Sequence, residues 1–77
     1  MAGIFFVQKE IYEIKVDDYE SLFQFRGYND ATDEYVFYDL AFLGQSEDKL
    51  FRYFPSEVLQ DVSDTIKKQN NLYKFYE

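Results

Sequence analysis

The sequence predicts an α+β fold, an antiparallel three- to four-stranded β-meander with one C-terminal helix packed on the sheet. Three observations lead to this prediction. Before Pro55, several short segments alternate between apolar and polar residues or are rich in aromatic and β-branched residues, as strands are. Three glycines and one proline divide the chain into short elements. The clearest helical spacing of apolar residues comes after Pro55.

The chain is expected to form a single domain, 1–77, because 77 residues supply only one small core. Nine Phe and eight Tyr make up 22% of the sequence. That is far more aromatic surface than a disordered acidic segment carries. We therefore expect an ordered domain that depends on the burial of aromatic side chains.

The expected strands are separated by polar turns and cover residues 4–16, 21–28, 34–43 and 49–54. The first is identified by the period-two alternation over Tyr12–Val16. Its length predicts a bend or bulge near Gln8–Lys9. The third is apolar at nearly every position except Asp39, which is typical of a central strand. Residues 44–48 are then expected to form a hairpin loop.

The segment from Asp17 to Gly27 has two interpretations. As a helix, it has Asp17 as N-cap, Glu20 at the third helical position and Gly27 as the closing residue. As a strand, it follows a turn over residues 17–20 and places Phe23 and Phe25 on one face. The strand is preferred.

The expected helix covers residues 56–70, with Ser56 as its N-cap. Its apolar stripe consists of Val58, Leu59, Val62 and Ile66. Asn70–Asn71 is the expected end of the helix. The apolar residues in 72–76 are then expected to fold back on the sheet, since an exposed apolar tail would promote non-specific association.

The missing residue types argue against catalysis and metal binding. There is no cysteine and no histidine, so thiolate and imidazole ligands are absent, as is the usual general base near neutral pH. The acidic loop 29–34 superficially resembles a calcium loop, but it lacks the central glycine and has Ala41 where the final glutamate belongs. We therefore predict no enzyme activity, no catalytic residue, no metal and no cofactor.

The charge predicts a basic protein as partner. The net charge is −7, and residues 10–48 carry eleven acids against two bases, which gives −9 in that stretch. Such a surface repels phosphates, so direct binding to nucleic acid is not expected. The apolar N-terminus is short and has no basic leader region, so we expect no signal peptide, no membrane contact and a cytoplasmic protein. The expected oligomeric state is a monomer or homodimer.

Three acidic clusters are the candidate partner-binding sites, because exposed carboxylates with neighbouring tyrosines suit an interface to arginine and lysine. Their acids are Asp17, Asp18 and Glu20; Asp30, Asp33 and Glu34; and Glu47 and Asp48. The tyrosines are Tyr19, Tyr28 and Tyr35. Charge reversal of the second cluster is expected to weaken binding without changing the fold.

No family motif is present, but the composition and length resemble those of phage-encoded inhibitors of host defence or nucleic-acid enzymes. That class includes anti-CRISPR proteins, anti-restriction DNA mimics and uracil-DNA glycosylase inhibitors. The resemblance implies stoichiometric occlusion of a basic nucleic-acid-binding surface on a defence or DNA/RNA-processing complex. Acidic immunity proteins and antitoxins share this signature. A structural or assembly subunit and a small regulatory adaptor are the alternatives.

Overall fold

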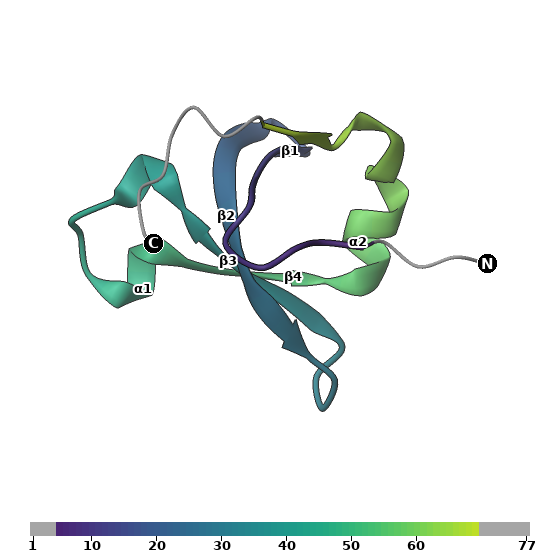
Figure 1. The fold of residues 1–77 in the computed structure, drawn as a ribbon, viewed down its shortest axis with the longest axis horizontal. Coiled ribbons are helices and arrows are strands. Elements are labelled where there is room, and N and C mark those ends of the chain that lie inside the picture. Colours follow the sequence, from purple (N-terminus) through teal and green to yellow (C-terminus); the bar gives the residue numbers. More distant parts are fainter. Residues whose placement is uncertain (1–4, 70–77) are drawn as a thin grey trace.

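Five antiparallel strands form one sheet in the part of the chain that the computed structural model describes, residues 5–69 (Figure 1). The strands are β1 (Ile11–Val16), β2 (Tyr19–Asn29), β3 (Glu34–Asp39), β4 (Phe51–Pro55) and β5 (Lys67–Lys68). Their order across the sheet is β4-β3-β2-β1-β5. The predicted α+β class with an antiparallel sheet is confirmed, with five strands where three or four were expected.

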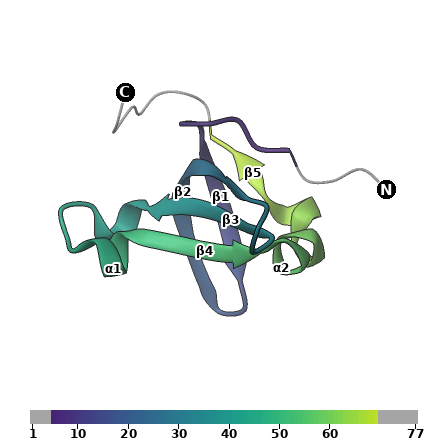
Figure 2. The same cartoon turned by 90° about the horizontal axis from the view of Figure 1, so that it is seen from below.

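Four short helical elements connect these strands. They are the 3-10 turn η1 (Leu40–Phe42), the helices α1 (Glu47–Leu50) and α2 (Ser56–Asp61), and the 3-10 turn η2 (Ser63–Thr65). Figures 1 and 2 show α1 and α2 at opposite ends of β4. After η2, the chain runs along the side of β1 that faces away from β2. There β5 pairs with β1.

The segment with two interpretations is a strand, as preferred. β2 begins after a turn at Asp17–Asp18 and pairs with β1 on one side and β3 on the other. Its register with β3 shifts between Phe25 and Gly27. A bulge of this kind bends and twists a strand. β2 is also the strand that joins β1 on one side to β3 on the other.

The core is aromatic, as the composition predicts. It consists of Phe6, Tyr12, Ile14, Phe23, Phe25, Phe37, Phe54 and Leu59. Phe6 packs edge-on against Tyr12 and Phe37, with ring centroids 4.9 and 5.2 Å apart. Such edge-to-face pairs add about 0.5–1.5 kcal/mol each beyond the burial of area. A residue upstream of the sheet therefore contributes a ring to the centre of the core.

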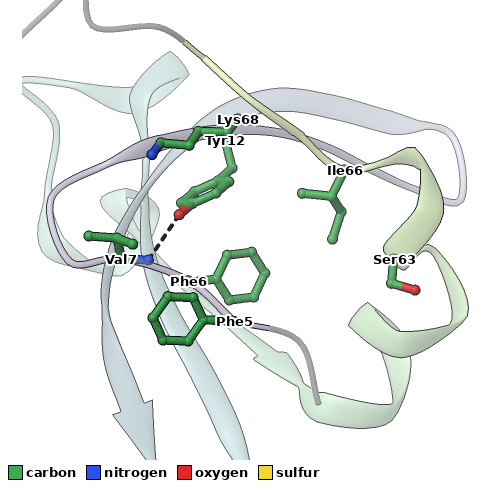
Figure 3. Close-up of a pocket in the computed structure, with 7 residues that line it drawn as sticks. All are labelled: Phe5, Phe6, Val7, Tyr12, Ser63, Ile66 and Lys68. Carbon is green, nitrogen blue, oxygen red and sulfur yellow. Dashed lines mark hydrogen bonds between the residues drawn. The ribbon is translucent and has the colours of Figure 1, made fainter. Parts of the chain in front are cut away.

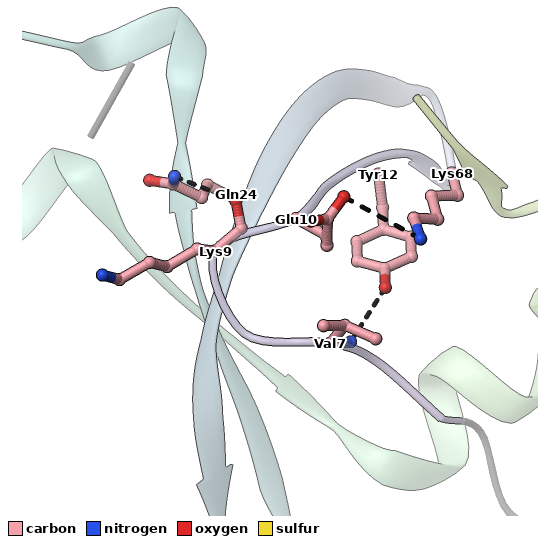
Figure 4. A network of polar contacts seen from close by, with 6 residues as sticks. All are labelled: Val7, Lys9, Glu10, Tyr12, Gln24 and Lys68. Carbon is pink, nitrogen blue, oxygen red and sulfur yellow. Dashed lines mark hydrogen bonds and ion pairs between the residues drawn. The ribbon is translucent and has the colours of Figure 1, made fainter. Parts of the chain in front are cut away.

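The predicted first strand, 4–16, is too long. Only Ile11–Val16 is strand, and the described residues before it form an irregular segment with a turn at Gln8–Lys9, where Lys9 has a positive φ of 72°. Figure 4 shows what holds this segment: Val7 N–H donates to the Tyr12 hydroxyl at 2.9 Å, and Gln24 Nε2 donates to the Lys9 carbonyl at 3.1 Å. The bend predicted near Gln8–Lys9 is therefore present, and the Lys9 backbone N–H also donates to the Phe25 carbonyl at 3.0 Å, so side-chain and backbone bonds together hold this segment.

The predicted third strand, 34–43, extends too far at its C-terminal end. The predicted fourth strand, 49–54, begins too early. β3 stops at Asp39, because the Asp39 carboxylate accepts the Ala41 backbone N–H at 3.0 Å and caps η1. Residues 44–48 are not a simple hairpin loop, since α1 begins at Glu47 and β4 begins only at Phe51.

The predicted helix over 56–70 is wrong beyond its second turn. α2 ends at Asp61, and the chain leaves helical geometry at Val62, with φ −111° and ψ 13°. Ser56 is the first helical residue and makes no side-chain cap, so its predicted role as N-cap is also wrong. The apolar stripe nevertheless packs against the core, with Leu59 fully buried. The expected helix end at Asn70–Asn71 and the expected tail in 72–76 lie outside the described residues.

Within residues 5–69, no helix has the length and apolar character needed to cross a membrane.

Candidate protein-binding surfaces

The first predicted cluster surrounds the turn between β1 and β2. Asp17 and Asp18 form the turn, and Asp17 has a positive φ of 57°, a conformation that Asp tolerates better than most residues. Glu20 lies on β2 opposite Lys15 of β1. All three acids are exposed, so the structure presents them to solvent beside a lysine.

Tyr19, predicted to join this cluster, faces inward instead. Its hydroxyl donates to Asp39 Oδ2 at 2.5 Å, and Ser21 Oγ donates to Asp39 Oδ1 at 2.6 Å. Asp39 is fully buried. Burial, together with the hydrogen bond to Asp39, raises the pKa of Tyr19. The Arg52 guanidinium stands 5.1 Å from the Tyr19 ring on the same side. The Tyr19 hydroxyl therefore serves the fold and is not offered to a partner.

The second predicted cluster is built around Asp33 in the β2–β3 turn. Asp33 Oδ1 accepts from the Tyr28 hydroxyl at 2.5 Å, and Oδ2 accepts from Ser56 Oγ at 2.8 Å. The Asp33 carbonyl also accepts the Ser56 backbone N–H at 3.0 Å. Asp33 thus ties the hairpin tip to the start of α2, so we expect the fold to tolerate charge reversal at Asp30 better than at Asp33.

These hydrogen bonds shift the pKa of both partners. The hydrogen bond to Asp33 raises the pKa of Tyr28 to about 12. Tyr28 first and Ser56 second lower the pKa of the Asp33 carboxyl, because both hydroxyls stabilise its charged form. Asp33 is therefore held as a carboxylate on an exposed surface.

The other members of the second cluster differ in exposure. Asp30 is exposed in the turn, whereas Glu34 is half-buried at the start of β3. Tyr28 is 48% exposed, and its ring lies 4.8 Å from the ring of Tyr35. Tyr35 also packs against Phe6 of the core. Tyr28 is thus the tyrosine of this cluster that a partner reaches most readily.

The structure adds Glu57 to this second cluster, and the sequence analysis did not include it. Glu57 is exposed in the first turn of α2, directly after Ser56. Neither residues 27–48 nor residues 53–66 contain Lys or Arg. Because Ser56 bonds to Asp33, these two base-free segments meet. The long-range contact that joins them has no local sequence signal.

The third predicted cluster, Glu47 and Asp48, forms the first turn of α1 and is exposed. Acids in the first turn are favoured by the partial positive charge of a helix N-terminus, so a local structural role accounts for them. α1 follows the end of β3, whereas the Asp33 turn precedes its start. The second and third clusters therefore do not meet.

Glu13, which none of the predicted clusters includes, forms an acidic pair with Glu20 of the first cluster. They project from β1 and β2, and a hydrogen bond with Glu20 raises the pKa of Glu13. Burial and the charge of Glu20 raise it further, while Lys67 opposes the change.

Ion pairing and metal ligation are sparse in the described part of the chain. One ion pair is present there, between Lys68 Nζ and Glu10 Oε1 at 3.9 Å (Figure 4). No group of three or more acidic side chains among residues 5–69 is arranged to hold a metal ion. Comparisons of the chain with protein-family models, curated proteins and solved structures found no match. No relative therefore indicates a function. The proposal for one rests on the chemistry of these surfaces.

Proposed function

We propose that the protein is a stoichiometric inhibitor that binds a basic protein and occludes a nucleic-acid-binding surface of a defence or DNA/RNA-processing complex. We assign the contact to the tip surface, defined as Asp30, Asp33, Glu34 and Glu57 together with Tyr28. In this proposal the protein turns over no substrate and needs no cofactor.

The observation that supports this choice is the junction between the β2–β3 hairpin and α2. Asp33 fixes Tyr28 through one carboxylate oxygen and Ser56 through the other. Asp33 and Tyr28 are thus held in place before a partner arrives, and an interface that is preorganised loses less entropy on binding. Tyr28 adds an aromatic ring, which suits the centre of an interface.

The charge of the tip surface favours a partner rich in arginine or lysine. It combines four acids with no base from either of the two segments that meet there. Arginine pairs with carboxylates in the same two-pronged geometry that it uses for phosphates. A carboxylate surface of this kind is suited to compete with nucleic acid.

The test uses two charge-reversal variants that change the net charge equally. The first, Asp30→Lys with Glu57→Lys, alters the tip surface but spares Asp33. The matched control, Glu47→Lys with Asp48→Lys, reverses two exposed acids of α1. Tagged wild type and both variants are incubated with bacterial lysate at low and high salt, and the retained proteins are identified by mass spectrometry.

We expect a nucleic-acid-binding protein to be retained by the wild type at low salt and to be displaced by added DNA. The tip variant should bind that partner more than tenfold more weakly, equivalent to about 1.4 kcal/mol or more, while the control keeps its affinity. Equal losses in both variants would mean that overall charge, and not the tip surface, carries binding. Circular dichroism of each variant checks that the fold is retained.

A second candidate function, a structural or assembly subunit, is favoured by a different surface. Phe5 is 82% exposed and Val7 is 42% exposed. They border an open hollow of about 410 Å³ whose walls also include Tyr12 and Ile66 (Figure 3). Apolar side chains beside a hollow suit insertion into a neighbouring subunit. Retention of the protein itself, unaffected by salt, would favour this candidate. An acidic immunity protein or antitoxin would use the tip surface in the same way as an inhibitor.

A further inference from the structure

The outer face of the sheet, the side opposite the core, carries a shallow groove next to the tip surface. By strand alternation, Val36 of β3 and Tyr53 of β4 point to this face, and they form one row across the strands with Gly27 of β2. Because Gly27 has no side chain, the row leaves a hollow of about 360 Å³, which Phe51 and Asn29 also border.

The groove is aromatic and open to solvent. Tyr53 is 53% exposed, and Val36 and Phe51 are half-buried. Phe51 stacks on Tyr38 with ring centroids 5.1 Å apart, so one wall is a stacked aromatic pair. Apolar groups that remain in contact with water gain free energy when the apolar side chain of a partner covers them.

The two ends of the groove carry opposite charges. Glu34 of the tip surface lies two residues before Val36 on β3, so its side chain points to the same face about 6.5–7 Å away. Tyr38 lies two residues after Val36, and the Arg26 guanidinium stands 4.8 Å from the centre of its ring. A basic side chain of a partner is therefore attracted to the Glu34 end and repelled from the Arg26 end.

We propose that this groove receives an extended segment of the protein partner that runs along β3, with apolar side chains over Val36 and Phe51 and an arginine or lysine paired with Glu34. Alternate side chains of an extended peptide are about 6.5–7 Å apart, which matches the distance between Val36 and Glu34. The other acids of the tip surface continue the attraction beyond Glu34. The inference rests on the proposed function, since it states the chemistry of the segment that a basic partner presents next to the tip surface.

The first test measures binding of a defined peptide to the full chain. The probe is a capped peptide in which two leucines and then one arginine occupy alternate positions, with serines between them. Amide signals of isotope-labelled protein are recorded as the peptide is added. We expect saturable shifts that are largest at Gly27, Val36 and Tyr53. Replacing the arginine of the peptide by glutamate should weaken binding by about tenfold or more, and replacing both leucines by serine should do the same.

Two variants of the protein test the groove itself. Gly27→Val fills its floor, and Gly27 has no positive φ; an added Cβ would lie 3.7 Å from Gln8 Nε2, which is an ordinary contact. Because glycine is unfavourable within a strand, this variant should keep or raise the free energy of unfolding in urea while it weakens peptide binding by about tenfold or more. Glu34→Gln should weaken binding of the arginine peptide, whereas the matched control in α1, Glu47→Gln, should not.

Several results would overturn the assignment of the groove. They are unchanged peptide binding by Gly27→Val, and shifts centred on Phe5 and Val7 instead of the outer face. Shifts of Val36 and Tyr53 that depend on protein concentration without peptide would assign this face to a second copy and overturn it as well.

Repeating the lysate experiment with Gly27→Val separates this inference from the proposed function. Loss of the partner by both the tip variant and Gly27→Val supports the two together. Loss by the tip variant alone would refute the groove and leave the proposed function standing. If the wild type retains no basic partner, the proposed function fails, and the peptide titration alone decides whether the groove binds such a segment.

Discussion

Asp39 offers the sharpest test of how the fold is held, because its carboxylate is fully buried and has three donors. Tyr19, Ser21 and the Ala41 backbone N–H all donate to it, at 2.5 to 3.0 Å. A hydrogen bond to a charged group contributes about 1.5–3 kcal/mol, and donors left without an acceptor cost more when they are shielded from water. Tyr19 and Ser21 are half-buried and partly recover bonds to water. We therefore expect Asp39→Ala to lower the free energy of unfolding by about 3–4 kcal/mol.

Urea unfolding followed by circular dichroism measures this loss. For a chain of this size, about 3 kcal/mol corresponds to a fall in Tm of roughly 12–24 °C. Asp39→Asn is the matched control, since its remaining carbonyl oxygen still accepts from Ser21 and Ala41, and it should lose only about 1–2 kcal/mol. Tyr19→Phe in the wild-type and Asp39→Asn backgrounds completes a double-mutant cycle. A loss below about 1 kcal/mol for Asp39→Ala, or equal losses for Ala and Asn, would refute this account of the network.

Four further predictions concern individual side chains. Tyr28 should titrate near pH 12 by ultraviolet absorbance, and Asp33→Asn should return its pKa toward the ordinary value of 10; an unchanged titration would contradict the Tyr28–Asp33 bond. Because the folded-state pKa of Asp33 is lowered, its contribution to stability is present above its unfolded pKa and is lost as the pH falls through the folded pKa. Asp33→Asn should therefore flatten the acid limb of the stability curve. Glu20→Gln should lower the raised pKa of Glu13, which is measured from its carboxyl chemical shift. A raised folded-state pKa means that the ionised form is unfavourable in the folded protein. The variant should therefore be more stable than the wild type at pH values above the unfolded pKa of Glu13. Leu59→Ala should destabilise the protein by about 2–5 kcal/mol in urea, because it leaves a cavity at a fully buried position, and a loss below about 1 kcal/mol would show that the core closes around it.

The centres of the strands could be predicted from the sequence, because alternation and aromatic content are local signals. Their ends could not. Asp39 interrupts an apolar run, which is a visible signal, but its role as a cap depends on donors that lie near it only in the folded chain. α1 has four residues, too few for a helical period to be recognised in the sequence.

The apolar stripe after Pro55 shows how a correct burial pattern leads to a wrong element. Leu59 and Val62 pack on the core from α2 and its end, and Ile66 reaches the same core after the 3-10 turn η2. A 3-10 turn repeats every three residues, close enough to the helical period to continue the stripe. Lys67 and Lys68 then pair with β1, a partner more than fifty positions away that no local pattern reveals.

The candidate site was predicted by composition and refined by contacts. Asp30 and Tyr28 are exposed as expected, whereas the Tyr19 hydroxyl is used internally. Asp33 was selected for its charge, but its bond to Ser56 spans 23 positions and makes it a structural centre. The same bond brings Glu57 to the site, which no motif in the sequence indicated.

The ends of the sheet have a consequence for how the protein coexists with its own copies. β4 is one edge strand, five residues long between α1 and α2, and its last residue, Pro55, has no N–H to donate. Among the strands of residues 5–69, β5 is the other edge strand, and it consists of two lysines. Short edges, proline and lysine are the features by which natural sheets resist extension by a strand from another molecule. The short β4 with Pro55 and the two-lysine β5 therefore oppose edge-to-edge association of this aromatic-rich chain.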